Sequence, residues 1–226
     1  MLILTGCSQQ VVSNSSGTTH RAAPGQLTYV AIGASDTFGT GTDDPYTQNW
    51  PSDLATKLGP RVHVINLGIP GIVVHDALNV EVPVALDAHP DLITVWLAVN
   101  DIVANVPTNS YSHDLDLLIS RLQAGMPHAI IAVANVPDLT LLPQFSKRDP
   151  HALDVRIADY NAIIADIVKR HHVILVDLTQ QTYNLKNHPE YISNDGLHPN
   201  ELGYLQLADL FYQALQSSLR TGNRSG

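Results

Sequence analysis

Five nearly continuous apolar runs, separated by amphipathic stretches, constrain the fold of this chain more than any other feature of its sequence. Runs of this kind are typical of strands that are covered on both faces of a sheet. Their alternation with helices predicts an α/β fold, a three-layer α/β/α sandwich with a five-stranded parallel sheet and right-handed crossovers. We predict strands at Leu27–Ala34, Val62–Leu67, Leu92–Val99, Ala129–Val133 and Val173–Leu178.

The stretches between the apolar runs have the periodicity of helices. The first predicted helix begins near Trp50 and ends at Gly59, with Pro51 at an early helical position, where proline is favoured. A second helix is predicted at about 74–88, although Pro83 should bend or break it. Further helices are predicted at about 110–123, 151–170 and 200–219. In the last of them, the predicted inward stripe is Leu205, Ala208, Phe211, Leu215 and Leu219.

The ends of the chain differ in composition from this central domain, which we place at residues 27–219. Residues 8–26 are polar and small, which predicts a flexible tether, and residues 220–226 form a similar tail. Leu4-Thr5-Gly6-Cys7 resembles a bacterial lipobox, although only four apolar residues precede it, against the roughly 7–15 of a normal signal core. Either residues 1–26 hold a truncated signal peptide with a lipidated Cys7, or the match is chance. The first reading predicts an extracytoplasmic protein, lipid-anchored at the cell surface or secreted.

Composition excludes several classes of protein. The formal net charge of −9 and the lack of a basic stripe argue against nucleic acid as a partner. A single cysteine excludes an intrachain disulfide and the all-cysteine zinc patterns. The histidines show no H-E-x-x-H spacing, so no metal site is predicted. Phosphate-loop, dinucleotide-binding and G-x-S-x-G patterns are also absent.

Four polar motifs stand where the predicted elements meet. Gly33–Asp36, Asn66–Gly68 and Ala98–Asp101 each end an apolar run, and Asp195–His198 precedes the last helix. Each motif alone reads as a turn or a helix cap. Ligands of parallel sheets, however, bind beyond the carboxyl ends of the strands, where these motifs would meet. A serine, an imidazole and a carboxylate together are the elements of a nucleophilic hydrolase, so we predict one assembled site.

These motifs resemble the four blocks of the SGNH hydrolases, also called the GDSL esterase/lipase family, from about Leu27 to Leu219. The resemblance implies a flavodoxin-like sheet and a catalytic triad in which Ser35 is the nucleophile, His198 the base and Asp195 its orienting acid. It implies an oxyanion hole made by the backbone N–H groups of Ser35 and Gly68 and the side chain of Asn100, and no cofactor or metal. Two positions depart from the family: Ala34 replaces the usual acid before the serine, and Ala98 replaces the usual glycine of the third block.

The predicted function is that of a serine esterase that hydrolyses carboxylic esters through an acyl-serine intermediate. Two alternatives stay open: an O-acyltransferase of the same fold that acts on glycans, and a catalytically silent glycan-binding module. The substrate would be a small-molecule, lipid or acylated-carbohydrate ester. Phe38, Tyr46 and Trp50 flank the nucleophile loop and are candidates for lining its pocket, although packing of Trp50 in the core is the stronger expectation.

Overall fold

The computed structural model describes residues 25–180 and 185–222 of the chain. The predicted lipobox with Cys7 and most of the predicted tether lie outside the described residues, as do residues 223–226 of the predicted tail. Among the described residues, no helix is long and apolar enough to cross a membrane.

The sheet confirms the predicted strands and their parallel direction. Its strand order is β2-β1-β3-β4-β5, the flavodoxin-like order, in which Val30 of β1 pairs with Ile65 of β2 and Ile93 of β3. β3 ends earlier than predicted, because Ala98 turns the chain and Val99 begins a helix. The strands are β1 (Leu27–Gly33), β2 (Val62–Asn66), β3 (Leu92–Trp96), β4 (Ile130–Ala134) and β5 (Ile174–Val176).

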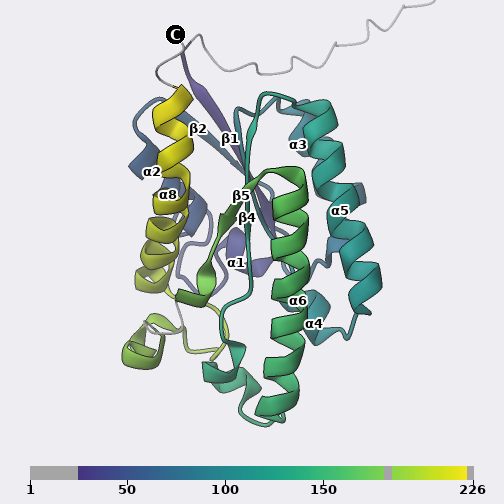
Figure 1. Cartoon of the computed structure of the whole chain (residues 1–226). Helices are drawn as coiled ribbons and strands as arrows, with labels where there is room; N and C mark the ends of the chain where they lie inside the picture. Colours follow the sequence, from purple (N-terminus) through teal and green to yellow (C-terminus); the bar gives the residue numbers. More distant parts are fainter. Residues whose placement is uncertain (1–24, 181–184, 223–226) are drawn as a thin grey trace, which may run out of the picture.

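Helices cover both faces of the sheet (Figure 1), as the sandwich prediction requires. On one side lie α2 (Trp50–Leu58) and α8 (Glu201–Gly222), and on the other lie α3 (Val74–Asp87), α5 (Thr108–Gly125) and α6 (Pro150–His171). Two short helices, α1 (Ser35–Phe38) and α4 (Val99–Val103), directly follow the carboxyl ends of β1 and β3. The strands point toward the lower end of the molecule in Figure 1, so these short helices mark the end where a ligand is expected.

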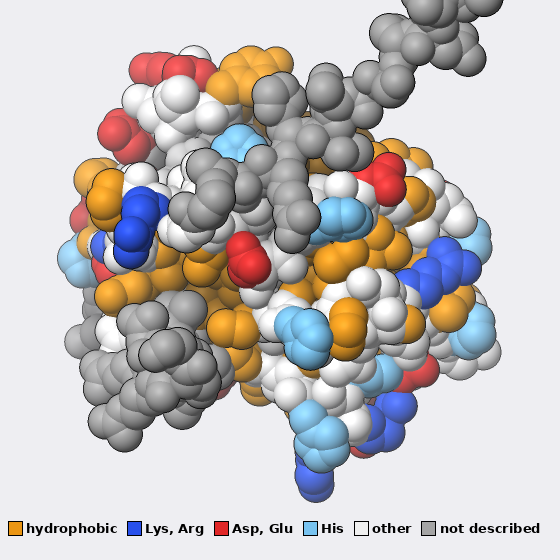
Figure 2. Space-filling view, turned by 90° about the horizontal axis from the view of Figure 1, so that it is seen from above, with side chains coloured by type: hydrophobic (Ala, Val, Ile, Leu, Met, Phe, Trp, Pro, Cys, Tyr) orange, Lys and Arg blue, Asp and Glu red, His pale blue; other side chains and the backbone are white. Residues whose placement is uncertain are grey.

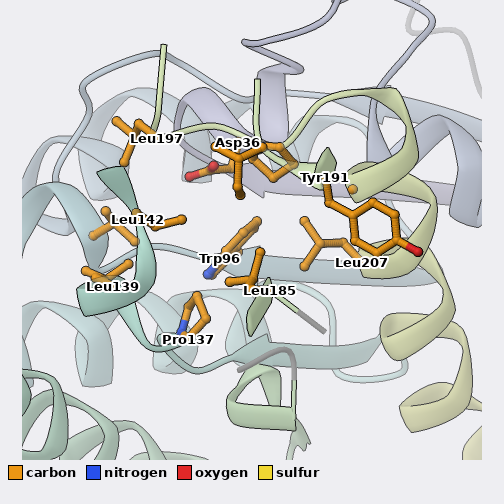
Figure 3. Close-up of a pocket in the computed structure, with 13 residues that line it drawn as sticks. Asp36, Trp96, Pro137, Leu139, Leu142, Leu185, Tyr191, Leu197 and Leu207 are labelled. Carbon is orange, nitrogen blue, oxygen red and sulfur yellow. The ribbon is translucent and has the colours of Figure 1, made fainter. Parts of the chain in front are cut away.

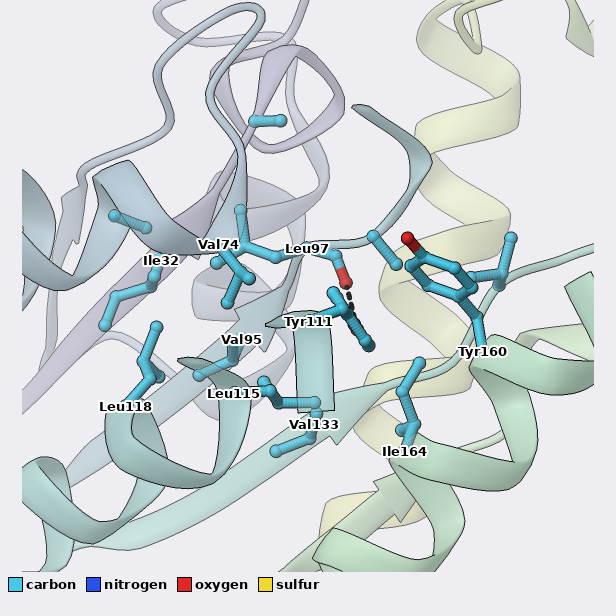
Figure 4. Close-up of a cluster of buried hydrophobic side chains, with 14 of the residues drawn as sticks. Ile32, Val74, Val95, Leu97, Tyr111, Leu115, Leu118, Val133, Tyr160 and Ile164 are labelled. Atoms are coloured by element: carbon cyan, nitrogen blue, oxygen red, sulfur yellow. Dashed lines mark hydrogen bonds between the residues drawn. The ribbon is translucent and has the colours of Figure 1, made fainter. Parts of the chain in front are cut away.

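Each face of the sheet has its own apolar cluster. Figure 4 shows the cluster under α3, α5 and α6, where the rings of Tyr111 and Tyr160 lie 4.4 Å apart and the Tyr111 hydroxyl donates to the Leu97 carbonyl at 3.1 Å. On the other face, Trp50 is fully buried and stacks on Phe211 of α8 at 4.0 Å. The expectation that Trp50 packs in the core is therefore confirmed, and each such burial stabilises the fold by about 1.5–3 kcal/mol.

The inward stripe of α8 differs from the prediction. Leu205 is 37% exposed, whereas Tyr204 and Leu207 are buried beside Ala208, Phe211 and Leu215. The buried set keeps helical spacing, and Leu205 lies about 100° around the helix from Tyr204. The Tyr204 hydroxyl also donates to the Thr40 carbonyl at 2.6 Å, which fixes the rotation of the helix against the loop after α1.

Pro83 does not break the second predicted helix, since α3 runs through it from Val74 to Asp87. A proline removes one backbone hydrogen bond from a helix. Val82 and Ala85 on either side of Pro83 are buried, so their packing offsets that loss. Tertiary burial thus overrides the local preference.

The opposite end of the molecule, at the amino ends of the strands, presents a mixed surface. Figure 2 shows histidine and apolar side chains there, interspersed with separate basic and acidic ones. The polar motifs found in the sequence lie at the other end, at the carboxyl ends of the strands.

Ala98 carries backbone strain, because its φ of 155° and ψ of −33° lie in a region that favours glycine. We expect Ala98→Gly to raise the free energy of unfolding by about 1 kcal/mol, since strain relief exceeds the entropic cost of glycine. Ala85→Gly is the matched control: Ala85 is equally buried but lies inside α3, so the change should destabilise. Urea unfolding measures the free energy of unfolding of both variants. An equal loss of stability in Ala98→Gly and Ala85→Gly would show that Ala98 is unstrained.

Candidate active site

Ser35 stands where β1 passes directly into α1. β1 ends at Gly33, Ala34 precedes the helix, and Ser35 is its first residue. Four residues later, Gly39 ends the helix with a φ of 109°. The short strand-to-helix turn leaves Ser35 half-buried at the edge of the sheet.

The structure brings Ser35 together with the predicted imidazole and carboxylate. His198 Nε2 lies 2.8 Å from Ser35 Oγ, although the two residues are 163 positions apart. His198 Nδ1 lies 2.6 Å from Asp195 Oδ2 on the other side of the ring. The His198 side chain is 13% exposed, so the ring is largely shielded from solvent. This chain of two hydrogen bonds is the arrangement that lets a serine hydroxyl transfer its proton to a base.

The second oxygen of the Asp195 carboxylate is held equally firmly. Oδ1 accepts from the Leu197 and His198 backbone N–H groups at 2.8 and 3.0 Å and from the Ser193 hydroxyl at 2.8 Å. Burial alone would raise the pKa of Asp195, but the hydrogen bonds from His198, Leu197 and Ser193 outweigh it and hold the pKa well below its usual range. The carboxylate therefore stays charged and keeps Nδ1–H as its donor.

Backbone pairing fixes the loop that carries His198. Ile192 and Pro199 form an antiparallel bridge, and the Ser193 N–H donates to the His198 carbonyl at 2.8 Å. The Asn200 N–H donates to the Tyr191 carbonyl at 2.9 Å, immediately before α8 begins. The proline that follows His198 restricts the backbone of that residue, and the two-stranded pairing restricts it further.

Gly68 lies against the backbone of α1. A Cβ atom there would overlap the backbone of Ala34, Thr37 and Phe38, so only glycine allows this approach. The Gly68 N–H donates to Asn66 Oδ1 at 2.9 Å, and Asn66 Nδ2 donates to the Thr37 carbonyl at 2.6 Å. Asn66 therefore ties the loop after β2 to the helix that begins with Ser35.

Asn100 and Asp101 hold the far end of that same loop. Asn100 Nδ2 donates to the Ile72 carbonyl at 2.9 Å, which leaves its second N–H available for another acceptor. Asp101 is fully buried, and both its oxygens lie near the Val74 N–H that opens α3, at 3.2 and 3.3 Å. Burial raises the pKa of Asp101 to about 7.

Glu81 of α3 is a buried acid that the sequence reasoning did not single out. It is 1% exposed, and its Oε1 accepts from the Gly33 N–H at 3.0 Å, two residues before Ser35. Its Oε2 and the Thr37 hydroxyl are buried without hydrogen-bond partners among the described residues. Burial raises the pKa of Glu81 to about 8, so the neutral form dominates at pH 7. The sequence signal that could have identified Glu81 is an acidic residue on the apolar face of a predicted helix.

Two other candidates of the sequence reasoning lie outside the site. Tyr46 is 79% exposed and makes an edge contact with Phe38, and neither ring lines the apolar pocket beside the triad. Among the described residues, no group of three or more His, Cys, Asp or Glu side chains is placed to hold a metal ion. The chemistry that the described groups can perform is proton transfer and nucleophilic attack by Ser35.

Comparisons with known proteins agree with this geometry. The sequence model of the GDSL-like Lipase/Acylhydrolase family matches residues 31–205, so the chain belongs to that family. An arylesterase of Vibrio mimicus is 26% identical over 191 residues, which cover 81% of this chain and 86% of that protein.

Solved structures share the fold at lower identity. The Clostridium thermocellum family 3 carbohydrate esterase matches with a TM-score of 0.70 and 22% identity, covering 87% of this chain and 98% of that one. The acetyl xylan esterase AlAXEase matches with a TM-score of 0.68 and 20% identity over 84% of this chain and all of that one. With the family match, these findings make the protein a carboxylic ester hydrolase.

Glu81 should make stability depend on pH. Its pKa is raised from 4.5 when unfolded to about 8 when folded, so its stabilising contribution is complete below pH 4.5 and is lost as pH rises toward 8. We expect Glu81→Gln to gain stability relative to wild type by a few kcal/mol between pH 5 and pH 8. Urea unfolding at several pH values measures this.

Glu201→Gln, the same change at an exposed residue in the first turn of α8, serves as the control, because Glu201 lacks the burial that raises the pKa of Glu81. The difference in the free energy of unfolding between this variant and wild type should not change between pH 5 and pH 8. A constant difference for Glu81→Gln as well would contradict the raised pKa of Glu81.

Proposed function

We propose that the protein hydrolyses its esters through an acyl-serine intermediate formed on Ser35. The observation that carries the proposal is the continuous hydrogen-bonded chain from Ser35 Oγ through His198 to Asp195. A serine hydroxyl is a weak nucleophile at its own pKa and needs an adjacent base. His198 Nε2 is within reach of that proton, and the charged Asp195 keeps the ring in the required tautomer.

The reaction proceeds in two halves. Ser35 Oγ attacks the ester carbonyl carbon while its proton passes to His198 Nε2, and the resulting imidazolium is stabilised by Asp195. The tetrahedral intermediate collapses as Nε2 returns the proton to the leaving alcohol oxygen. Water then attacks the acyl-serine with His198 again as the base, and Ser35 is released with the carboxylic acid.

The negatively charged oxygen of the intermediate would accept hydrogen bonds from three donors. These are the backbone N–H groups of Ser35 and Gly68 and the free N–H of the Asn100 side-chain amide. Ser35 is the first residue of α1, where a backbone N–H has no acceptor within the helix. Gly68 must share its N–H with Asn66 Oδ1, which it already contacts. Asn66 is therefore a competitor for one oxyanion donor.

We further propose that residues 1–26 hold a truncated signal peptide with a lipidated Cys7. A lipidated Cys7 followed by a polar tether would place this esterase outside the cytoplasm, at a membrane surface. Its substrate would be an ester of a small molecule, a lipid or an acylated carbohydrate. Mass spectrometry of the natural protein from the membrane fraction tests this, and an unmodified Cys7 would overturn it.

Ser35→Ala should lose nearly all activity, by a factor on the order of 10⁴–10⁶, because no other group replaces the nucleophile. Hydrolysis of 4-nitrophenyl butyrate measures the loss, and a fluorophosphonate probe should label wild type but not the variant. Ser112→Ala, the same change on the outer helix α5, should keep wild-type activity. Activity of Ser35→Ala equal to wild type would refute the nucleophile.

Asn100→Ala should lower kcat by a factor on the order of 10²–10³ with little change in KM, because the lost donor acts mainly in the transition state. Asn79→Ala is the matched control, since its amide also donates to a backbone carbonyl, that of His75, on the surface of α3. Melting temperatures of both variants separate a catalytic effect from unfolding. A kcat within twofold of wild type in folded Asn100→Ala would remove it from the oxyanion hole.

A further inference from the structure

A partly enclosed apolar pocket adjoins the hydrogen-bonded triad. Figure 3 shows the side chains around it. Trp96 of β3 lies in the wall between two groups of side chains, of which Leu139, Leu142 and Leu197 form one side. Tyr191 and Leu207 lie on the opposite side, with the hydroxyl of Tyr191 pointing away from the pocket.

The pocket wall is built from residues adjacent to those of the candidate site. Asp36 directly follows Ser35, and Val99 directly precedes Asn100. Leu197 and Pro199 stand on either side of His198. A group bound in this pocket therefore lies beside the segments that hold the reacting atoms.

Two polar groups in the wall lack protein partners. Within the described residues, the Asp36 carboxyl has a hydrogen bond only to its own backbone N–H. Trp96 is 6% exposed, and its Nε1–H is buried without an acceptor in the described part of the chain. Burial raises the pKa of Asp36, while the nearby imidazole of His198 opposes the rise. The pocket thus offers hydrocarbon contacts, one indole donor and one carboxyl acceptor.

A hydroxyl group matches these two polar groups. Its proton can be donated to the Asp36 carboxyl, and its oxygen can accept from Trp96 Nε1–H. An ammonium group has no acceptor for the indole, and a plain alkyl chain leaves both groups unpaired, which is costly in a buried site. The apolar remainder of the wall suits the hydrocarbon that carries the hydroxyl.

The acyl part of the ester fits this pocket better than the alcohol part. The alcohol departs in the first half of the reaction and needs an open route, whereas the acyl group stays bound to Ser35 until water attacks. We propose that the pocket binds the acyl chain and that Asp36 and Trp96 select chains that bear a hydroxyl group. This inference rests on the acyl-serine reaction proposed above.

The test compares matched pairs of 4-nitrophenyl esters: 3-hydroxybutyrate with butyrate, and 6-hydroxyhexanoate with hexanoate. Each kcat/KM is divided by the rate of non-enzymatic hydrolysis by hydroxide, which removes the electronic effect of the hydroxyl. For wild type, we expect at least about a tenfold preference for the hydroxylated ester in one pair, the range for a hydrogen bond to a charged or buried group. Equal rates within both pairs would overturn the inference, whereas no hydrolysis of any ester would overturn the proposed function instead.

Variants assign the preference to its residues. Asp36→Leu should bring the hydroxyl preference to about 1, and Trp96→Phe should lower it at least threefold, because each removes one hydrogen-bond partner. Tyr191→Phe, the matched control, should keep the wild-type preference, since its hydroxyl points out of the pocket. Fluorophosphonate labelling of Ser35 in each variant shows that the triad is intact. An undiminished preference in labelled Asp36→Leu, or a preference confined to hydroxyls on the alcohol part, would overturn the assignment.

Discussion

The position of β1 between β2 and β3 is the constraint on which the site depends. Parallel pairing places the carboxyl ends of these three strands at one edge, so Ser35, Gly68 and Asn100 follow the strands at the same end of the molecule. Helix α8 then fixes the fourth segment, because its buried face rests on the sheet and the residues just before it carry His198. The 2.8 Å contact between Ser35 and His198 is thus a product of sheet order and helix packing.

Buried acids support this edge of the sheet from beneath. Glu81 accepts from Gly33 just before the nucleophile, and Asp101 caps α3 from the residue after Asn100. Both carboxyl groups have raised pKa values because they are buried, in contrast to Asp195, whose hydrogen bonds keep it charged. Two of these acids therefore act in structure as buried hydrogen-bond acceptors with raised pKa values, and the third keeps its charge beside the imidazole.

Sequence reasoning predicted the strands, most helices and the family, because these rest on local signals. The structure places Ser35 and Asp195 within hydrogen-bond distance of the two ring nitrogens of His198, and their catalytic roles stay a prediction. Strand runs, helix caps and the spacing of Asp195 and His198 are all readable within short windows. Sequence reasoning wrongly placed Leu205 in the buried stripe of α8, because tertiary packing, which the sequence does not show, decides the rotation of the helix. Pro83 does not break α3, because the buried residues around it tolerate one missing hydrogen bond. The role of Glu81 was not predicted, because its hydrogen-bond partner Gly33 lies 48 positions away in the chain. The pocket beside Asp36 was not predicted, because its lining residues come from several separate segments.

The wall of the pocket and the acid of the triad share a support. The Gln144 N–H donates to the Gly196 carbonyl at 3.0 Å, and Pro143 lies against Gly196, so the turn between Asp195 and Leu197 rests on the segment that begins at Leu142. Enlarging the cavity from that side would also move the turn that orients the imidazole. With an acyl chain bound in this pocket, as proposed above, room for a bulkier chain that leaves the turn in place must come from the opposite wall, near Tyr191 and Leu207.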